Sequence, residues 1–147
     1  MKSPEEVKTE FTREWIRKAE NDLTTAEHLY KGGILYVYGT TFHAQQAVEK
    51  YLKAFLVWHQ IEFRKTHDIQ ELLNLVSGVD NNLPESIAES VNLTPYGVEY
   101  RYPGDYPDAT MEDAAKALDV VRRVRDEIMA RLPEVIFKKD EVSGPEF

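Results

Sequence analysis

The sequence predicts an all-α protein, an antiparallel up-down four-helix bundle with an additional short helix. Three observations lead to this prediction. Apolar residues recur with a helical period in several segments, no segment alternates with period two over a useful length, and short loops separate the segments. Because short loops join antiparallel neighbours, the expected order of the four principal helices is up-down.

The first helix is expected to begin at the stretch "SPEE". Ser3 suits the N-cap, Pro4 the first helical position, and Glu6 the closing position of a capping box. Gly32 and Gly33 end the helix, because glycine favours the backbone conformations that terminate helices. One face of this helix is apolar and should pack inward, with the residues Trp15, Ala19, Leu23, Ala26 and Tyr30.

A second helix is expected from about residue 35 to residue 61, and it contains "FHAQQAVEKYLKAFLVW". Its apolar arc is wider than one partner helix needs, which predicts that it is the most central helix. Its polar residues fall in one arc, with His43 at the edge: Gln46, Glu49, Lys50 and Lys53. The arc could be a solvated face with a Glu49–Lys53 ion pair, or the lining of a site.

The remaining helices follow from caps and breakers. Thr66 is expected to cap a helix that ends at Gly78, and another helix should begin just before Pro84. Pro95 breaks or restarts that helix, so "TPYGVEYRY" is a separate short helix. "TMED" at 110–113 predicts a capped start for the last helix, which should end near residues 132–133. One helical domain therefore spans residues 1–137, and residues 138–147 form a disordered tail.

Composition narrows the possible functions. The 147 residues suit one domain, and the absence of cysteine excludes disulfides and thiolate metal sites. No segment reads as a membrane span or a signal peptide, which predicts a cytoplasmic protein away from membranes. The net charge is −8, with nine acidic and three basic residues in 61–110, so duplex DNA is not an expected partner. No metal or cofactor motif is present, and we expect neither.

The segment "TPYGVEYRYPGDYPDAT" is unusual because four tyrosines surround Arg101, a lone cation. Such a segment could bind an anion, with Arg101 pairing a phosphate while Tyr102 or Tyr106 stacks a base. The alternative is structural: the tyrosines would cover one end of the bundle, and Arg101 would pair with an acid such as Glu49.

Four stretches together resemble the HEPN family: "AENDLTTAEHL", "FHAQQAVEKYLKAFL", "THDIQELL" and "LTPYGVEYRYP". The resemblance implies a helical bundle, usually a homodimer, often encoded beside a nucleotidyltransferase as a toxin–antitoxin pair. Many members of the family are metal-independent ribonucleases, and others bind RNA, nucleotides or proteins without catalysis. The resemblance also implies one polar centre, formed by Gln46, Glu49, Lys50, Lys53 and Arg101.

The sequence departs from the family's ribonuclease motif, an Arg followed after four to six residues by a His. No His follows Arg101. Tyr106 is at the first position where the motif allows the His, but a tyrosine is a poor base at neutral pH because phenols ionise near pH ~10. The resemblance thus predicts a non-catalytic or degenerate homodimer that binds a nucleotide, single-stranded RNA or a nucleotidyltransferase. One alternative is a metal-independent endoribonuclease toxin that uses Arg101 with a base outside the motif. Another is a purely structural interaction partner of a nucleotidyltransferase. The predicted ligand-binding residues are Arg101, Gln46, Glu49, Lys50, Lys53, Tyr102 and Tyr106.

Overall fold

The structure is a computed structural model that describes residues 1–83, 85–98, 104 and 107–138. All regular elements in these ranges are helical, which confirms the all-α fold class. The α-helices are α1 (Pro4–Lys31), α2 (Val37–Trp58), α3 (Ile69–Val79), α4 (Glu85–Ala88), α5 (Thr94–Val98) and α6 (Met111–Ala130). Three 3-10 segments accompany them: η1 (Ile34–Tyr36), η2 (Glu89–Leu93) and η4 (Glu134–Ile136).

Helix α1 begins and ends where its sequence signals lie. Ser3 is the N-cap, and its hydroxyl accepts a hydrogen bond from the amide of Glu6 at 3.1 Å. The helix ends at Gly32, and Gly33 has φ of 86°. That left-handed value favours glycine, since a Cβ would clash with the backbone there.

Helix α2 is shorter at both ends than the sequence predicts. The residues expected to start it form η1, and α2 itself begins at Val37. At the other end, Gln60 adopts φ of 58° and the amide of Ile61 donates to the carbonyl of Leu56 at 2.9 Å. This bond closes the last turn at Trp58, because a left-handed residue just past the end satisfies the final carbonyls.

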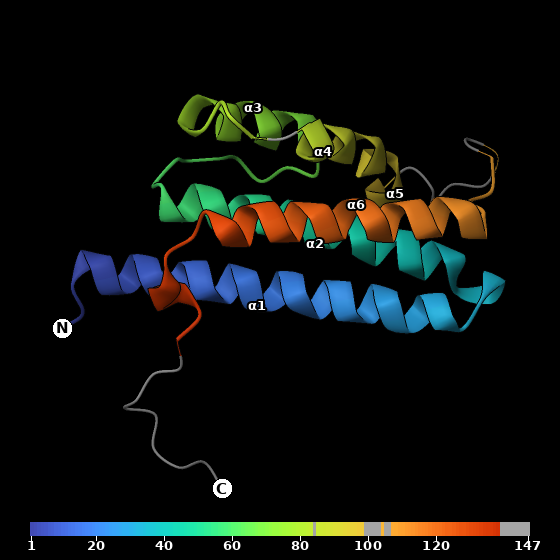
Figure 1. The fold of residues 1–147 in the computed structure, drawn as a ribbon, viewed down its shortest axis with the longest axis horizontal. Helices are drawn as coiled ribbons and strands as arrows, with labels where there is room; N and C mark the ends of the chain where they lie inside the picture. Colours follow the sequence, from blue (N-terminus) through green and yellow to red (C-terminus); the bar gives the residue numbers. More distant parts are fainter. Residues whose placement is uncertain (84, 99–103, 105–106, 139–147) are drawn as a thin grey trace, which may run out of the picture.

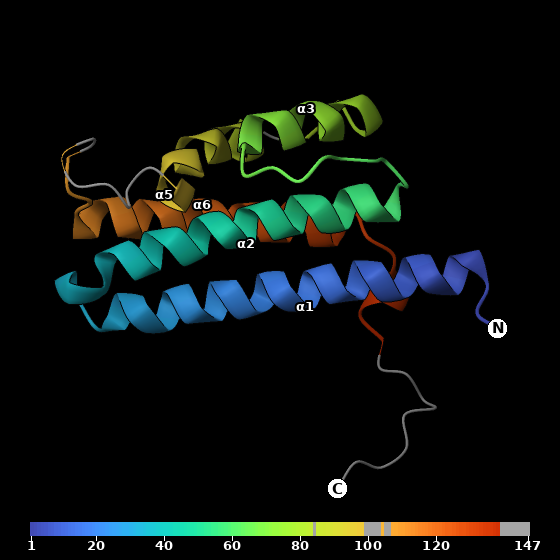
Figure 2. The same ribbon diagram turned by 180° about the vertical axis from the view of Figure 1, so that it is seen from behind.

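The connection between α2 and α3 is longer than the expected short loop, and it returns along α2. The backbone carbonyl of Thr66 accepts from Lys53 at 3.2 Å, and that of His67 accepts from Gln45 at 3.3 Å. As a result α3 runs in the same direction as α2, while α1 runs the opposite way (Figures 1 and 2).

The caps of the later helices are partly as predicted. Thr110 and Asp113 form the expected capping box of α6. Asp68, rather than Thr66, caps α3, because its carboxylate accepts from the amide of Gln70 at 3.0 Å. The expected helix after Pro84 is divided into α4 and η2, and α5 begins at Thr94, where the separate short helix is predicted.

The hydrophobic core surrounds α2, as its wide apolar arc predicts. Helix α2 packs against α1, α6, α3 and α5. Of the inward face predicted for α1, Ala19, Leu23 and Ala26 are buried, and Trp15 and Tyr30 are half-buried. The other helices contribute buried core residues that include Ala47, Leu52, Phe55, Leu72, Leu118 and Val121. Within the described residues, no helix is long and apolar enough to cross a membrane.

Ion pairs join α6 to its neighbours. In α6, Arg125 contacts Glu20 of α1 at 2.9 Å. At the end of α6, Arg131 contacts Asp80 at 2.8 Å, and this guanidinium holds the pKa of the Asp80 carboxyl below its ordinary value. That contact holds the end of α3 against α6.

Candidate functional site

The polar arc of α2 is not a plain solvated face. Glu49 is 2% exposed and Lys53 is 7% exposed, although both are charged residues. The returning segment 59–68 and α5 cover this side of α2, and Figure 2 shows α2 between α1 and that segment. Since burial of charge is costly without partners, each of these two residues needs compensating contacts.

The Glu49 carboxylate is the centre of a buried hydrogen-bond network. Nδ1 of His67 lies 3.0 and 3.2 Å from its two oxygens. The side-chain amide of Gln45 donates to the same carboxylate, and Lys53 Nζ lies 3.6 Å away. The Glu49–Lys53 pair expected from the spacing of the two residues is therefore present, but it is buried.

Lys53 is enclosed by aromatic rings as well as by acceptors. Its Nζ donates to the carbonyl of Thr66 at 3.2 Å and lies 5.5 Å from the ring centroid of Trp15 and 5.9 Å from that of Phe63. Cations are attracted to the faces of such rings. The ammonium thus holds the returning segment against α1 and α2.

Gln45 is a member of this network that the sequence prediction missed. Its amide donates to Glu49 and to the carbonyl of His67, and its oxygen accepts from Gln46 at 2.7 Å. Gln45 is fully buried, next to the apolar arc. The available signal was an amide at the edge of that arc, since a buried amide needs several hydrogen-bond partners.

Gly97 of α5 packs directly on the Gln45 side chain. A Cβ at position 97 would lie 2.7 Å from Gln45 Cδ, far inside van der Waals contact. Glycine therefore allows α5 to approach the network closely. The short helix that precedes Arg101 in the chain therefore packs against Gln45.

We expect Gly97→Ala to lower the free energy of unfolding by about 1–3 kcal/mol, because the displaced Gln45 would lose buried hydrogen bonds. Denaturant unfolding measures this loss. Gly78→Ala is the matched control, since a Cβ there meets nothing within 4 Å and the residue is helical. Equal midpoints for the two variants would contradict the close packing of α5.

The structure brings together four of the seven predicted ligand-binding residues. Gln46 and Lys50 are half-buried beside Glu49 and Lys53, and Lys50 forms an ion pair with Asp22 of α1. The other three, Arg101, Tyr102 and Tyr106, lie outside the described residues. A ligand-binding role for all seven remains a prediction.

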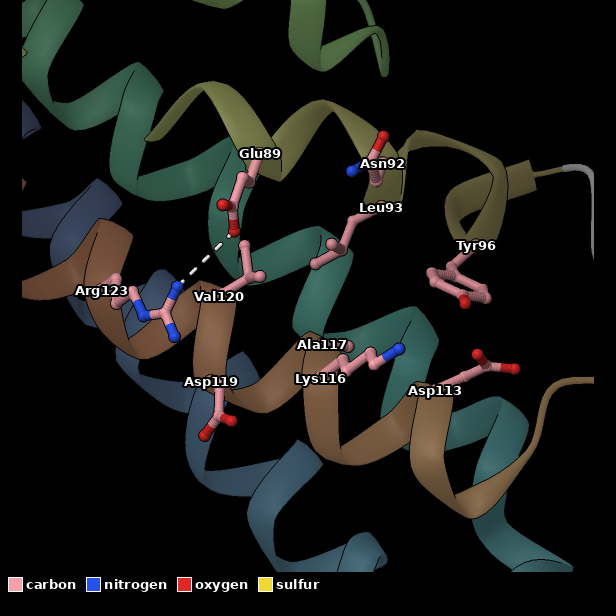
Figure 3. A pocket seen from close by; sticks show the side chains of 10 residues that line it. All are labelled: Glu89, Asn92, Leu93, Tyr96, Asp113, Lys116, Ala117, Asp119, Val120 and Arg123. Carbon is pink, nitrogen blue, oxygen red and sulfur yellow. Dashed lines mark ion pairs between the residues drawn. The ribbon is translucent and has the colours of Figure 1, made fainter. Parts of the chain in front are cut away.

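A hollow lies between η2–α5 and α6 (Figure 3) and has a volume of about 530 Å³. Its floor is apolar, with Leu93, Ala117 and Val120, and Tyr96 stands at one end. On its rim, Arg123 pairs with Glu89 at 3.5 Å. The charged groups of this hollow lie mostly on the surface, whereas Glu49 and Lys53 are buried and oriented by hydrogen bonds, so the α2 network is the stronger candidate site.

No metal centre accompanies the network within the described residues, where no three His, Asp or Glu side chains are grouped as ligands. The chemistry that the network can offer is hydrogen bonding and charge. The Glu49 carboxylate orients the His67 ring. Because an ionised carboxylate can only accept hydrogen bonds, Nδ1 of His67 carries the hydrogen of this contact, and the bond fixes the position of the ring.

Comparison with known proteins agrees with this architecture. A family model described as the HEPN domain matches residues 12–132. Among solved structures, the crystal structure of TT1696 from Thermus thermophilus is similar, with 25% sequence identity and a TM-score of 0.68. The alignment covers 82% of this chain and 98% of that chain. A search of curated proteins gives no match.

Proposed function

Since this chain belongs to the HEPN domain family, we propose that it binds single-stranded RNA or a nucleotide as a homodimer and does not cleave it efficiently. The observation that carries the proposal is the buried Glu49 network. A carboxylate, an amide, an imidazole and an ammonium are oriented together, and α5 packs on the amide. Side chains fixed by hydrogen bonds in this way can position the residues that bind a ligand.

The burial of Glu49 and Lys53 suits them to positioning rather than to direct contact with a ligand. Gln46 and Lys50 are more accessible on α2, and Arg101 follows α5 by three residues along the chain. In this proposal Arg101 and Lys50 meet phosphates, and Tyr102 or Tyr106 stacks a base. Gly97 and Gln45 connect the start of the Arg101 segment to the buried network.

One observation favours a second candidate function, a metal-independent endoribonuclease. The contact of His67 with the buried Glu49 is the arrangement that orients a general base, and His67 is exposed on its other side. The sequence contains no His after Arg101, so the family's own base is absent and binding without cleavage is the first candidate.

We expect Arg101→Ala to weaken binding of labelled single-stranded RNA at least about tenfold, because removing one charge-assisted contact costs about 1.5–3 kcal/mol. Fluorescence anisotropy at fixed salt measures the affinity. Arg122→Ala, in the seam between α6 and Glu27 of α1, removes the same charge elsewhere and should change little. The same RNA incubated in EDTA should remain intact. Cleavage that Arg101→Ala abolishes would replace the binding proposal with the ribonuclease.

We further expect a homodimer, because two-fold dimers are the commonest oligomers and the family commonly forms them. Sedimentation velocity at micromolar concentration should show a species of twice the 17.0 kDa chain mass. A monomer alone under these conditions would contradict the prediction.

A nucleotidyltransferase partner in a toxin–antitoxin pair is the finer form of the proposal. Co-expression with an adjacently encoded nucleotidyltransferase should yield a complex that co-purifies. If the two proteins separate while RNA binding persists, the chain acts as a stand-alone binder.

A further inference from the structure

A second oriented histidine lies on the opposite flank of α2, against α1. Nδ1 of His43 is 2.8 Å from one carboxylate oxygen of Asp22, and Lys50 Nζ donates to the other oxygen. Asp22 is 6% exposed, and a buried charge without a partner is costly. The ammonium of Lys50 balances the negative charge of Asp22 within the cluster. The proposed function above does not use His43 or Asp22.

The Asp22 carboxylate fixes which ring nitrogen of His43 points away from the cluster and whether that nitrogen carries a hydrogen. A carboxylate has no hydrogen to donate, so Nδ1 must carry the hydrogen of this bond. In the neutral ring Nε2 then presents a lone pair, on the side of the ring away from Asp22. The His43 side chain is 31% exposed, whereas the Asp22 side chain that contacts Nδ1 is 9% exposed. The cluster therefore offers a fixed hydrogen-bond acceptor beside the ammonium of Lys50.

Gln46 lies on the same face of α2 as His43 and Lys50 and is bonded to the Glu49 network through Gln45. His43, Gln46 and Lys50 are spaced three and four residues apart, so they share one face of α2. The amide of Gln46 also donates to Gln45, which contacts Glu49. A track of polar side chains thus follows this side of α2 from His43 and Lys50 through Gln46 to Glu49, and an oriented imidazole lies at each end.

We propose that this track binds RNA in preference to DNA, and that Nε2 of His43 accepts a hydrogen bond from a ribose 2′-hydroxyl while Lys50 meets the neighbouring phosphate. The 2′-hydroxyl is the donor that distinguishes RNA from DNA, and it fits an acceptor that cannot change its tautomer without losing Asp22. The inference rests on the proposed function, and it adds how this binding site distinguishes the sugar.

The test compares anisotropy titrations of one labelled oligouridylate with the matching oligodeoxyuridylate and the 2′-O-methyl form. The wild-type protein should bind the ribose form about threefold to tenfold more tightly than either analogue, the factor that one hydrogen bond contributes. His43→Phe keeps a ring and leaves Asp22 paired with Lys50, and it should bring the three affinities together. His28→Phe, at an exposed position of α1, is the matched control and should keep the preference.

Each other outcome is decisive. Equal affinities of the wild-type protein for the three oligonucleotides would overturn this inference and leave the proposed function intact. A preference that survives His43→Phe, or that disappears in His67→Phe instead, would remove His43 from the role. If none of the three oligonucleotides binds, the proposed function fails together with the inference.

Discussion

Leu52→Ala and Leu118→Ala should each lower the free energy of unfolding by about 2–5 kcal/mol. Leu52 lies on the inner face of the central helix and is fully buried, and Leu118 lies in the apolar stripe of α6 with 2% exposure. Truncation removes buried apolar area and leaves a cavity, because the surrounding helices can relax only in part. Urea unfolding at one fixed protein concentration measures the loss, since dimerisation would add a concentration term.

Leu35→Ala provides the matched control for these two substitutions. Leu35 is 87% exposed in η1, so the same chemical change removes almost no buried area. Its free energy of unfolding should stay within about 0.5 kcal/mol of wild type. Equal losses in all three variants would show that α2 and α6 do not present these faces to the core.

Glu49→Gln should lower the free energy of unfolding by about 3–5 kcal/mol, the loss expected when one member of a buried ion pair is removed. Lys53 would then keep its charge in a site where it is 7% exposed. Its remaining partners, the Thr66 carbonyl and two aromatic rings, do not carry a compensating negative charge. Adding Lys53→Met should recover part of the loss, because the double variant buries no unpaired charge.

The surface pair Glu112–Lys116 tests whether burial is the cause. Its N–O distance is 3.6 Å, the same as in Glu49–Lys53, and both pairs have the same spacing along a helix. Both residues of this pair are largely exposed, so Glu112→Gln should change stability by less than about 1 kcal/mol. Similar losses for Glu49→Gln and Glu112→Gln would contradict the buried network.

The helices and their inner faces could be predicted because each depends on local signals. The α1 stripe with Leu23, the α6 stripe with Leu118 and the capping box at Thr110 are all read from residues close together in sequence. Side chains three and four residues apart share a helix face whatever the rest of the chain does. The central position of α2 follows in the same way, from the width of its apolar arc.

The candidate site was predicted only in part. The polar arc predicted that Gln46, Glu49, Lys50 and Lys53 lie together, and that Glu49 pairs with Lys53. It did not predict which of them would be buried. A solvated face and the lining of a site have the same pattern of polar residues along one helix. Their exposure to solvent depends on which other segments cover that face.

The tertiary structure determines which residues of the polar arc are buried, and it does so through segments that have no periodic sequence pattern. Residues 59–68 return along α2 and place Thr66 and His67 over Lys53 and Glu49. Asp22 meets His43 and Lys50 only because α1 and α2 pack with these positions in register. The sequence by itself therefore determined the helices, their caps and their apolar faces, all of which are local. The tertiary structure determined which charged side chains are desolvated and which partners they contact, because desolvation depends on residues far apart in the chain.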